Sequence, residues 1–441
     1  MLKRRIARPR VALAAAAALA VIAAVAACGS SNGASGSGGS GSVTLTFATN
    51  QITGENTGTT PAFKNLISEF EKQNPGVHVQ LEEAQNTALQ PLIQLAFSSH
   101  NVPDIFNFWR PQPAFNMNNY IASGELGDLT SLAQTPALKN EFPGSSWQTA
   151  TVNGKVWGLP LTNYAVPLLV NKAVFAKAGL PLPTTWQLLV KDVPALKAKG
   201  FIPWTVSTEA ADQSDDRLLD YVLDRELGNQ TALNLFEGKG SFTSAKVEKA
   251  LSDYLSLSAG YGPPDASSLD DYSAISKYYN TGRSAMILTN SAYTSEVSGS
   301  AAQTTEVIPF PVIPGGAETT PHMEKDLTTL MYASTAALAD PTKAPLVKKF
   351  LTLATSLPQE QLLSDNGVLP AAPAVKPDPA KSGQVFSSIE QITAAESEDR
   401  WLGDARTPSQ QQSFYPLMSQ TWSGSLTAGS LASQLQSMFQ Q

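Results

Sequence analysis

A set of aromatic and planar polar residues in this 441-residue chain has the chemistry to bind a ligand rich in hydroxyl groups. Flat aromatic rings can stack on the apolar C–H faces of such a ligand, and planar polar side chains can bond two of its hydroxyl groups at once. A buried hydroxyl group left without a partner would cost on the order of 1–3 kcal/mol, so the polar side chains would set specificity. The candidate binding residues are Asn50, Glu82, Trp109, Asn163, Tyr164, Trp204, Asn290, Tyr293, Asp399 and Trp401.

Several of these candidates also have a purely structural interpretation. Trp109 follows a predicted strand and Trp204 lies within one, so each ring can either stack on a ligand or pack in a core. Asn290 can bond a ligand or form a turn. Asp399 and Trp401 belong either to the ligand site or to a solvated helix surface. The sequence leaves both interpretations open.

The sequence lacks the short motifs that mark common classes of enzyme. The histidines His78, His100 and His322 are far apart, and none lies in an H-E-x-x-H metal motif. No predicted strand runs into a G-x-S-x-G turn, and no G-x-x-x-x-G-K-[ST] phosphate loop occurs. A glycoside hydrolase needs only two facing carboxylates, so the 37 acidic residues leave that class open. We expect no catalytic residue, no metal site and no cofactor.

The elements that must position these residues alternate between strand and helix in the N-terminal third. Strands are expected at 43–47, 77–81 and 103–108. Between them lie amphipathic helices, one beginning at Pro61 and one covering 89–96. Strand–helix–strand units pack as right-handed parallel crossovers, and their ligands collect at the carboxyl ends of the strands. Those ends carry Asn50, Glu82 and Trp109.

The most informative stretch covers residues 151–180. Asn153 and Gly154 form a two-residue turn between short strands, because both tolerate positive φ. The apolar run 166–170 is long enough to cross a sheet once, and Asn171 leads into a helix that ends at Gly179.

This stretch also resembles a known family. It reads V-N-G-K-V-W-G-L-P, then L-L-V-N-K-x-V-F-x-K-A-G-L, then P-x-T-W, which is similar to the extracellular solute-binding lipoproteins of bacterial carbohydrate importers. Residues 282–286 and 307–311 resemble further family marks, whereas 323–328 lack the glycines that many relatives carry there. The resemblance implies that residues 159–166 line a cleft that holds a sugar, with Asn163 and Tyr164 in it. It also implies the roles of Tyr293, where relatives often carry an aromatic ring that stacks on the ligand, and of Asp399, where some relatives present an acid that faces the cleft.

The N-terminus is typical of an export signal rather than of a folded domain. Five basic residues precede an alanine-rich apolar run, Val11 to Ala27, which is too short and too weakly hydrophobic to indicate a membrane span. Small residues before Cys28, the sole cysteine, resemble a lipobox. We therefore expect a signal peptide at 1–28, a lipid on Cys28 that anchors the protein to the membrane, and a flexible Gly/Ser tether at 29–42.

Charge and length limit the partners and the fold. The chain holds 30 basic and 37 acidic residues, and removal of the five leader cations leaves 25 basic residues and a net charge of −12. Such an acidic chain argues against a nucleic-acid partner. About four hundred residues remain, which is too many for one core and indicates two lobes.

The sequence thus predicts a two-lobed α/β fold of the periplasmic-binding-protein type II class, each lobe a mainly parallel sheet flanked by helices. The first lobe is expected at 43–158 plus 289–331 and the second at 159–288 plus 332–441. Hinge crossovers are expected near Leu159, Thr289 and Leu330.

The family resemblance implies a monomeric receptor on the extracellular face of the cell membrane. It would bind a mono- or oligosaccharide between its lobes and deliver it to the permease of an ABC transporter, without catalysis. A binder of another solute, such as a peptide, polyamine or polyol phosphate, is the alternative, and a secreted glycoside hydrolase is a further one. A peptide or polyamine binder would show charged clamps, which the sequence does not display.

Overall fold

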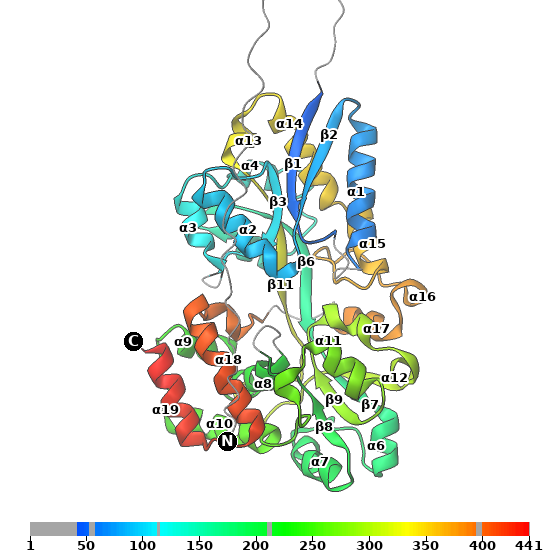
Figure 1. Ribbon diagram of the computed structural model, residues 1–441, viewed down its shortest axis with the longest axis vertical. Coiled ribbons are helices and arrows are strands. Elements are labelled where there is room, and N and C mark those ends of the chain that lie inside the picture. The colour runs from blue at the N-terminus through cyan, green and yellow to red at the C-terminus, as the bar shows by residue number, and fades with distance from the viewer. Residues whose placement is uncertain (1–41, 53–57, 113–114, 210–213, 394–398, 441) are drawn as a thin grey trace, which may run out of the picture. The chain divides into compact units, whose positions relative to one another are not determined.

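A computed structural model describes residues 42–52, 58–112, 115–209, 214–393 and 399–440. The predictions about the leader, Cys28 and most of the Gly/Ser tether lie outside these residues. None of the helices in the described ranges combines the length and the apolar character needed to cross a membrane. The described chain contains two main sheets, and each is the centre of a lobe (Figure 1).

The first lobe is built on a five-stranded mixed sheet. Its strand order is β2 (Val77–Glu83), β1 (Val43–Thr49), β3 (Ile105–Trp109), β11 (Glu324–Ala333) and β6 (Leu159–Val166). β1 is parallel to both β2 and β3, because α1 (Thr60–Gln73) and α2 (Asn86–Ser98) return the chain across the sheet after each strand. β11 runs antiparallel to β3 and to β6.

The second lobe is built on a four-stranded sheet. Its strand order is β10 (Thr305–Ile308), β7 (Leu168–Asn171), β9 (Ser284–Leu288) and β8 (Ile202–Thr205). β8 and β9 are parallel, whereas the pairs β7–β9 and β10–β7 are antiparallel. The prediction of a two-lobed α/β fold is confirmed, but the expectation of mainly parallel sheets is wrong. β11, for example, enters the first lobe from the second and therefore runs antiparallel to β3 and β6.

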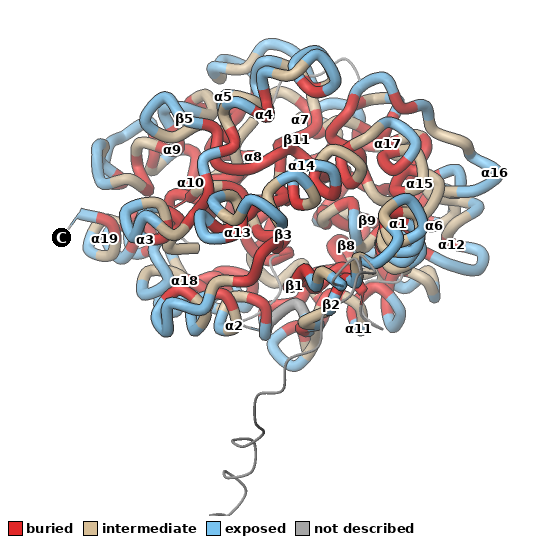
Figure 2. Tube along the Cα trace, turned by 90° about the horizontal axis from the view of Figure 1, so that it is seen from above, coloured by how far each residue is buried: buried red, intermediate tan, exposed pale blue. Residues whose placement is uncertain are grey.

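Three clusters of buried apolar residues hold these sheets and helices together. The first lobe has one core, which includes Phe47, Phe106 and Phe350. In the second lobe, successive residues of β7 point to opposite faces, so Leu168 belongs to one core and Leu169 to another. Figure 2 shows buried residues along β3 and α8 (Ser214–Leu227), whereas α16 (Pro379–Ser382) is mostly exposed.

Two adjacent strands, β6 and β11, connect the lobes. Leu159, at the start of β6, packs in the core of the first lobe, whereas Val166, at its end, packs in the core of the second. The ladder between β6 and β11 has register shifts between Leu327 and Leu330. Such bulges bend a strand and raise its local twist, so this part of the ladder is the natural place for a hinge.

The predicted lobe boundaries are partly wrong. Residues 335–375 pack against the first sheet rather than the second, as shown by the ring of Phe350, whose centroid is 5.3 Å from that of Phe47. Residues 289–322 stay in the second lobe, where β10 pairs with β7. Besides β6 and β11, a third segment connects the lobes. It runs from α15 (Leu357–Asp365) to α17 (Gln384–Thr393) and does not lie near Thr289. An apolar stripe shows that a helix face is buried but not in which core.

The remaining elements surround the two sheets. In the first lobe these are α3 (Met117–Ala122), α4 (Thr130–Ala133), α5 (Gly144–Thr149), β4 (Thr151–Val152), β5 (Lys155–Val156), α13 (Thr335–Ala339) and α14 (Lys343–Ala354). In the second lobe they are α6 (Lys172–Ala178), α7 (Trp186–Ala198), α9 (Asn229–Phe236), α10 (Ala245–Ser258), α11 (Asp271–Ala274), α12 (Gly299–Thr304), α18 (Pro408–Ser423) and α19 (Ala428–Phe439). Single helical turns occur at Ala266–Ser268, Ile275–Tyr279, Ser291–Glu296 and Leu402–Ala405.

The local structure of residues 151–180 agrees with its prediction. Asn153 and Gly154 have φ values of 53° and 74° in the turn between β4 and β5. The Asn171 side chain accepts hydrogen bonds from the backbone N–H groups of Ala173 and Val174 at the start of α6, which ends at the left-handed Gly179. These features are local, so the sequence alone can specify them.

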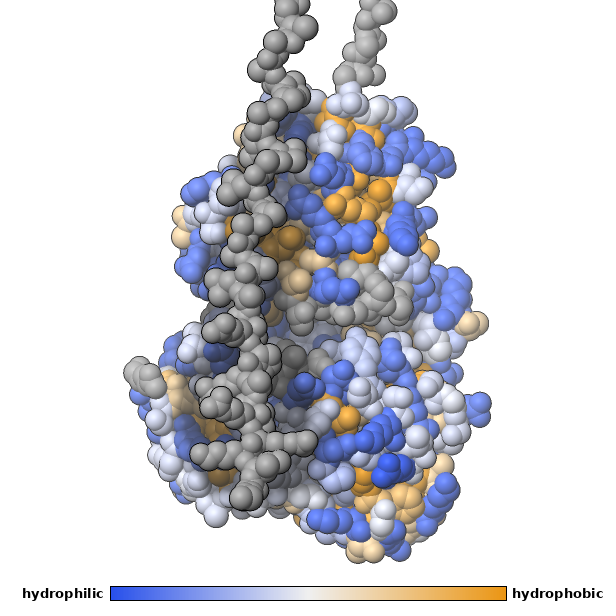
Figure 3. All heavy atoms as spheres, viewed as in Figure 1, coloured by the Kyte–Doolittle hydropathy of each residue, from blue (hydrophilic) through white to orange (hydrophobic). Residues whose placement is uncertain are grey.

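The surface of the described chain carries few large apolar side chains. Among the described residues, Leu95, Val190 and Leu357 are exposed, and they come from three different helices. On the face seen in Figure 3, hydrophilic and apolar side chains are interspersed. Buried polar groups are therefore the more informative guide to a site.

Candidate functional site

Polar side chains at the carboxyl ends of β1 and β3 lie together, as their positions in a parallel sheet predict. Asn50 is buried, and its Oδ1 accepts hydrogen bonds from Asn107 Nδ2 at 2.8 Å and Gln51 Nε2 at 2.6 Å. Trp109 is half-buried, and its ring stacks on Phe115 with centroids 4.5 Å apart. Asn50 and Trp109 thus occupy the edge where ligands of such sheets collect.

Arg110, next to Trp109, joins the two lobes. Its guanidinium group is buried and forms ion pairs with Asp326 on β11 and with Asp404 in the helical turn Leu402–Ala405 of the second lobe. It also donates to the backbone oxygen of Leu327 at 2.9 Å, beside the bulge in β11. A cation of the first lobe therefore meets an acid of the second lobe. The sequence drew attention to the strand end but not to this residue.

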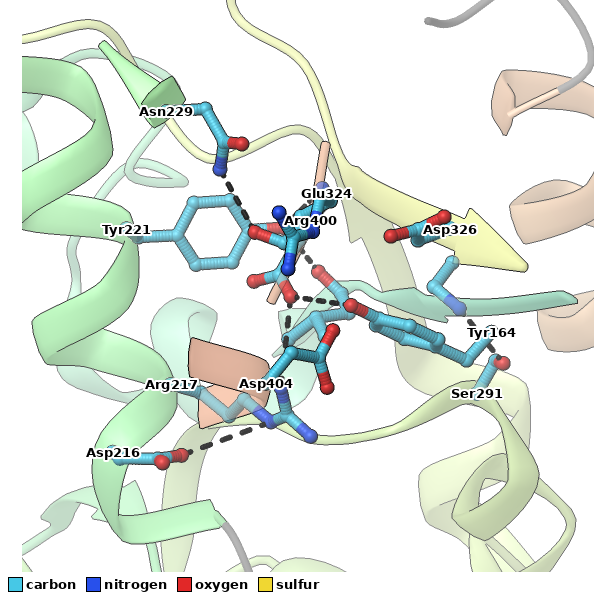
Figure 4. A network of polar contacts seen from close by, with 12 residues as sticks. Tyr164, Asp216, Arg217, Tyr221, Asn229, Ser291, Glu324, Asp326, Arg400 and Asp404 are labelled. Atoms are coloured by element: carbon cyan, nitrogen blue, oxygen red, sulfur yellow. Dashed lines mark hydrogen bonds and ion pairs between the residues drawn. The ribbon is translucent and has the colours of Figure 1, made fainter. Parts of the chain in front are cut away.

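The two predicted residues of the crossover strand β6 are both buried between the lobes. Asn163 Nδ2 donates to the backbone oxygen of Pro370 at 3.1 Å, whereas its Oδ1 has no hydrogen-bond partner within the described chain. Tyr164 donates its hydroxyl to Glu324 Oε1 at 3.0 Å (Figure 4). Burial raises the pKa of Tyr164, so it stays a neutral hydrogen-bond donor.

Charged residues of α8 and the C-terminal segment surround Tyr164. The Arg217 guanidinium carbon lies 5.9 Å from the ring centroid of Tyr164 and 4.4 Å from that of Trp401. Arg217 Nη1 is also 3.6 Å from Glu324 Oε1. Burial raises the pKa of Glu324 to about 7, although Arg217 opposes that shift. This carboxyl group therefore changes its charge near neutral pH.

A small cavity lies beside this cluster and is lined mainly by acids. Its volume is about 10 Å³, which is room for about one water molecule. Burial raises the pKa of Asp224 to about 6, despite the Arg225 guanidinium group beside it. The lining residues are Asp220, Tyr221, Asp224, Asn229, Glu324, Asp399, Arg400 and Leu402.

Asp224, His322 and Asp399 are a possible set of metal ligands by geometry, since their ligand atoms lie within 4.8 Å of one another. However, Arg225 Nη1 lies 2.9 Å from His322 Nε2 and pairs with Asp224. A guanidinium group thus already provides the positive charge at this position. Burial alone would lower the pKa of His322, but its contact with Asp399 outweighs that effect and raises it. The set is better described as a salt-bridge network than as a metal site.

Comparison with known proteins identifies the family. The model of the family described as bacterial extracellular solute-binding protein matches residues 54–361. The chain belongs to this family. It is accordingly a member of a family of bacterial extracellular solute-binding proteins.

Relatives of this solute-binding protein include characterised and uncharacterised receptors. It is 30% identical to the multiple sugar-binding protein of Streptococcus mutans over 144 residues. This segment covers 33% of this chain and 32% of that protein. It is 28% identical over 211 residues to an ABC transporter extracellular-binding protein of Pyrococcus horikoshii, covering 45% and 47% of the two chains. The chain thus matches less than half the length of these curated relatives.

Solved structures share the fold over nearly their whole length. A chitin oligosaccharide binding protein superposes with a TM-score of 0.76 at 20% identity, covering 90% of this chain and 98% of that one. A protein from work on xylan utilization by Caldanaerobius polysaccharolyticus superposes with a TM-score of 0.75 at 24% identity. The superposition covers 90% of this chain and 99% of that one. At such identities the likeness shows the fold alone.

The structure does not bring all predicted residues of the solute-binding protein together. Trp204 is 1% exposed, and its Nε1 donates to the backbone oxygen of Leu257, so it is a core residue and its assignment to the site is wrong. Trp401 is also buried, with its ring covered by Arg217 and Arg406. Trp401 therefore does not lie on a solvated helix surface, and its assignment to the ligand site is not supported, because Arg217 and Arg406 lie over its buried ring.

Of the other predicted residues, Asp399 lines the cavity, whereas Asn290, Tyr293 and Glu82 have contacts elsewhere. Asn290 caps the helical turn Ser291–Glu296, and Tyr293 packs edge-on against Tyr272 with centroids 4.9 Å apart. Glu82 is half-buried on β2, paired in register with Ala48. Asp399 lines the acidic cavity, so it is not on a solvated helix surface.

Proposed function

We propose that this solute-binding protein captures a mono- or oligosaccharide between its two lobes and delivers it to the permease of an ABC importer. The observation that carries the proposal is the buried polar junction between the lobes, where Arg110, Tyr164 and Glu324 meet. The half-buried ring of Trp109 precedes Arg110 at the same strand end. Aromatic surface and paired polar groups are the chemistry that a sugar requires. The multiple sugar-binding protein of Streptococcus mutans and the chitin oligosaccharide binding protein support the same ligand class.

The expected mechanism is closure of the lobes about β6 and β11. A ligand shifts the equilibrium between open and closed forms only by its differential affinity for the two, and contacts from both lobes provide that difference. Arg110 and Asp404 face each other from opposite lobes, so they form their ion pair only when the lobes meet. The permease would recognise the closed form.

A thermal-shift screen of the chain beginning at Gly29 tests this function. The panel holds neutral mono- and oligosaccharides, amino sugars, amino acids, peptides and polyamines, and a ligand that binds only the folded state raises the melting temperature. We expect a shift with one class of saccharide, and no loss of that saccharide over hours. A shift accompanied by cleavage would identify a glycoside hydrolase instead, and a response to amino acids, peptides or polyamines alone would contradict the sugar assignment.

We also propose that Cys28 carries a lipid that holds the monomeric protein at the outer face of the cell membrane. The support is the basic leader, the apolar run and the small residues before this sole cysteine. Cys28→Ala should release the protein from the membrane fraction into the medium, whereas the native protein should yield a diacylglyceryl-modified N-terminal peptide by mass spectrometry. Retention of the variant in the membrane would contradict the proposal.

A further inference from the structure

Asp220 is a buried carboxylate that no other group of the described chain neutralises directly. Its residue is 2% exposed, and neither carboxylate oxygen has a hydrogen-bond partner within the described residues. No ion pair within 4.0 Å involves it among these residues. Burial of an unpaired charge is costly, and native proteins supply a partner for almost all such groups. Asp220 therefore points to a partner from outside the described residues.

The neighbours of Asp220 leave the cavity with a surplus of negative charge. Asp224 is one helical turn further along α8, and its Oδ1 also has no hydrogen-bond partner in the described chain. The cavity is lined by four acids and one arginine, Arg400. Other nearby cations already contact acids, since Arg225 pairs with Asp224 and Arg406 pairs with Asp216. Burial and the carboxylate of Asp216 raise the pKa of Asp220, although the guanidinium groups of Arg406 and Arg217 oppose that shift.

The size of the cavity limits what can enter it. About 10 Å³ accommodates a group of the size of one water molecule, not a sugar ring. An ammonium group has about that size, donates three hydrogen bonds and carries the charge that two unpaired carboxylate oxygens need. A hydroxyl group would donate one hydrogen bond and leave the charge in place.

We propose that the saccharide bound by this protein carries a free, protonated amino group, which enters the cavity and binds Asp220 and Asp224. The ring that bears the amine lies outside the cavity, which is too small to hold it. This inference rests on the proposed saccharide-binding function and narrows the ligand to amino sugars with an unacetylated amine. The sequence did not reveal this pair of acids, because a helix as rich in charge as α8 is usually exposed, whereas Asp220 and Asp224 are buried.

Matched ligands test the inference by titration calorimetry on the mature chain. The probes are glucosamine and its β-1,4 oligomers, their N-acetylated counterparts, and the corresponding glucose oligomers. Hydrogen bonds to a charged group predict that the free amines bind about 10- to 100-fold more tightly than the acetylated or neutral partners. Asp220→Asn keeps the size of the side chain and should abolish that preference.

Two controls separate the possible failures. Asp128→Asn changes an exposed acid of the first lobe and should leave the preference intact. Asp224→Asn should weaken the preference in the same direction as Asp220→Asn, which provides a second test if one variant does not fold. Equal binding of amine, acetylated and neutral saccharides would overturn the inference and leave the proposed function standing. Failure of every saccharide to bind would overturn the proposed function itself.

Discussion

Arg110 of the first lobe forms an ion pair with Asp404 of the second lobe, and both side chains are almost fully buried. The same guanidinium group pairs with Asp326 on β11, one of the two strands that connect the lobes. One cation thus binds the hinge strand and the opposite lobe at once. Arg110 therefore couples a strand of the connection to the position of the opposite lobe.

Asp404→Asn should therefore favour the open form. Removal of one partner of a buried pair is costly for the state that contains it, typically about 3–5 kcal/mol, whereas the cores of the separate lobes are unchanged. We expect a larger radius of gyration by small-angle X-ray scattering and a ligand affinity at least about tenfold lower. Asp128→Asn, which affects the exposed pair with Lys155, is the control. Identical scattering of the variant and the native protein would contradict this role.

The tryptophans Trp109 and Trp204 should behave in opposite ways. Trp204→Ala removes a ring that is 1% exposed, so it should lower the free energy of unfolding by about 3–5 kcal/mol. Trp109→Ala removes a half-buried ring, so it should cost less stability and weaken ligand binding by about tenfold. Urea unfolding and titration calorimetry on both variants provide the comparison. A Trp109 variant with native affinity would exclude this ring from the site.

Asn171→Ala should destabilise the second lobe without affecting the ligand site. The Asn171 side chain caps α6 and also accepts from Thr304 Oγ1 at 3.1 Å. Loss of an N-cap costs about 0.5–2 kcal/mol, and urea unfolding should detect it. Asn171→Asp keeps the acceptor oxygen and should stay close to the native stability. An alanine variant as stable as the native protein would show that the cap is dispensable.

Glu390 on α17 should make stability depend on pH. It is 7% exposed, and burial raises its pKa from 4.5 to about 7, although Ser364 donates a hydrogen bond to it. Between these two pH values the folded protein retains a proton that the unfolded chain has lost. The free energy of unfolding therefore falls as the pH rises through that window.

Glu390→Gln removes this titration and should flatten the pH dependence. At about pH 8 the variant should be more stable than the native protein by on the order of 1–2 kcal/mol, because no carboxylate remains at this buried position. Urea unfolding at a series of pH values measures the slope, with the exposed Glu83→Gln as the control. An unchanged slope would show that Glu390 ionises freely in the folded protein.

The parts of the fold that depend on local pattern could be predicted from the sequence. The turn at Asn153, the cap at Asn171 and the first strand–helix–strand units appear where expected, because neighbouring residues determine them. Which lobe the later segments join could not be predicted from the sequence. The stripe that contains Phe350 fits either core equally well, and only the tertiary structure places it against Phe47.

The candidate site was predictable only in part for the same reason. Asn163 and Tyr164 lie at the junction as the family resemblance implied, but Arg110, Arg217 and Asp220 were missed. The sequence of α8 is rich in charge, which is typical of an exposed helix, yet every one of its residues is buried. Its acids and arginines contact charges from distant segments, such as Arg406 with Asp216, and no local signal reveals such pairs.

The three connections between the lobes also determine when the protein can fold. The sheet of the first lobe lacks a strand until β11 has been synthesised, and the core of the second lobe lacks Phe414 and Leu435 until the last two helices exist. Both cores are therefore completed late in synthesis, and their contacts between distant segments form slowly. A polypeptide whose cores are completed late is well suited to passage through a membrane before folding.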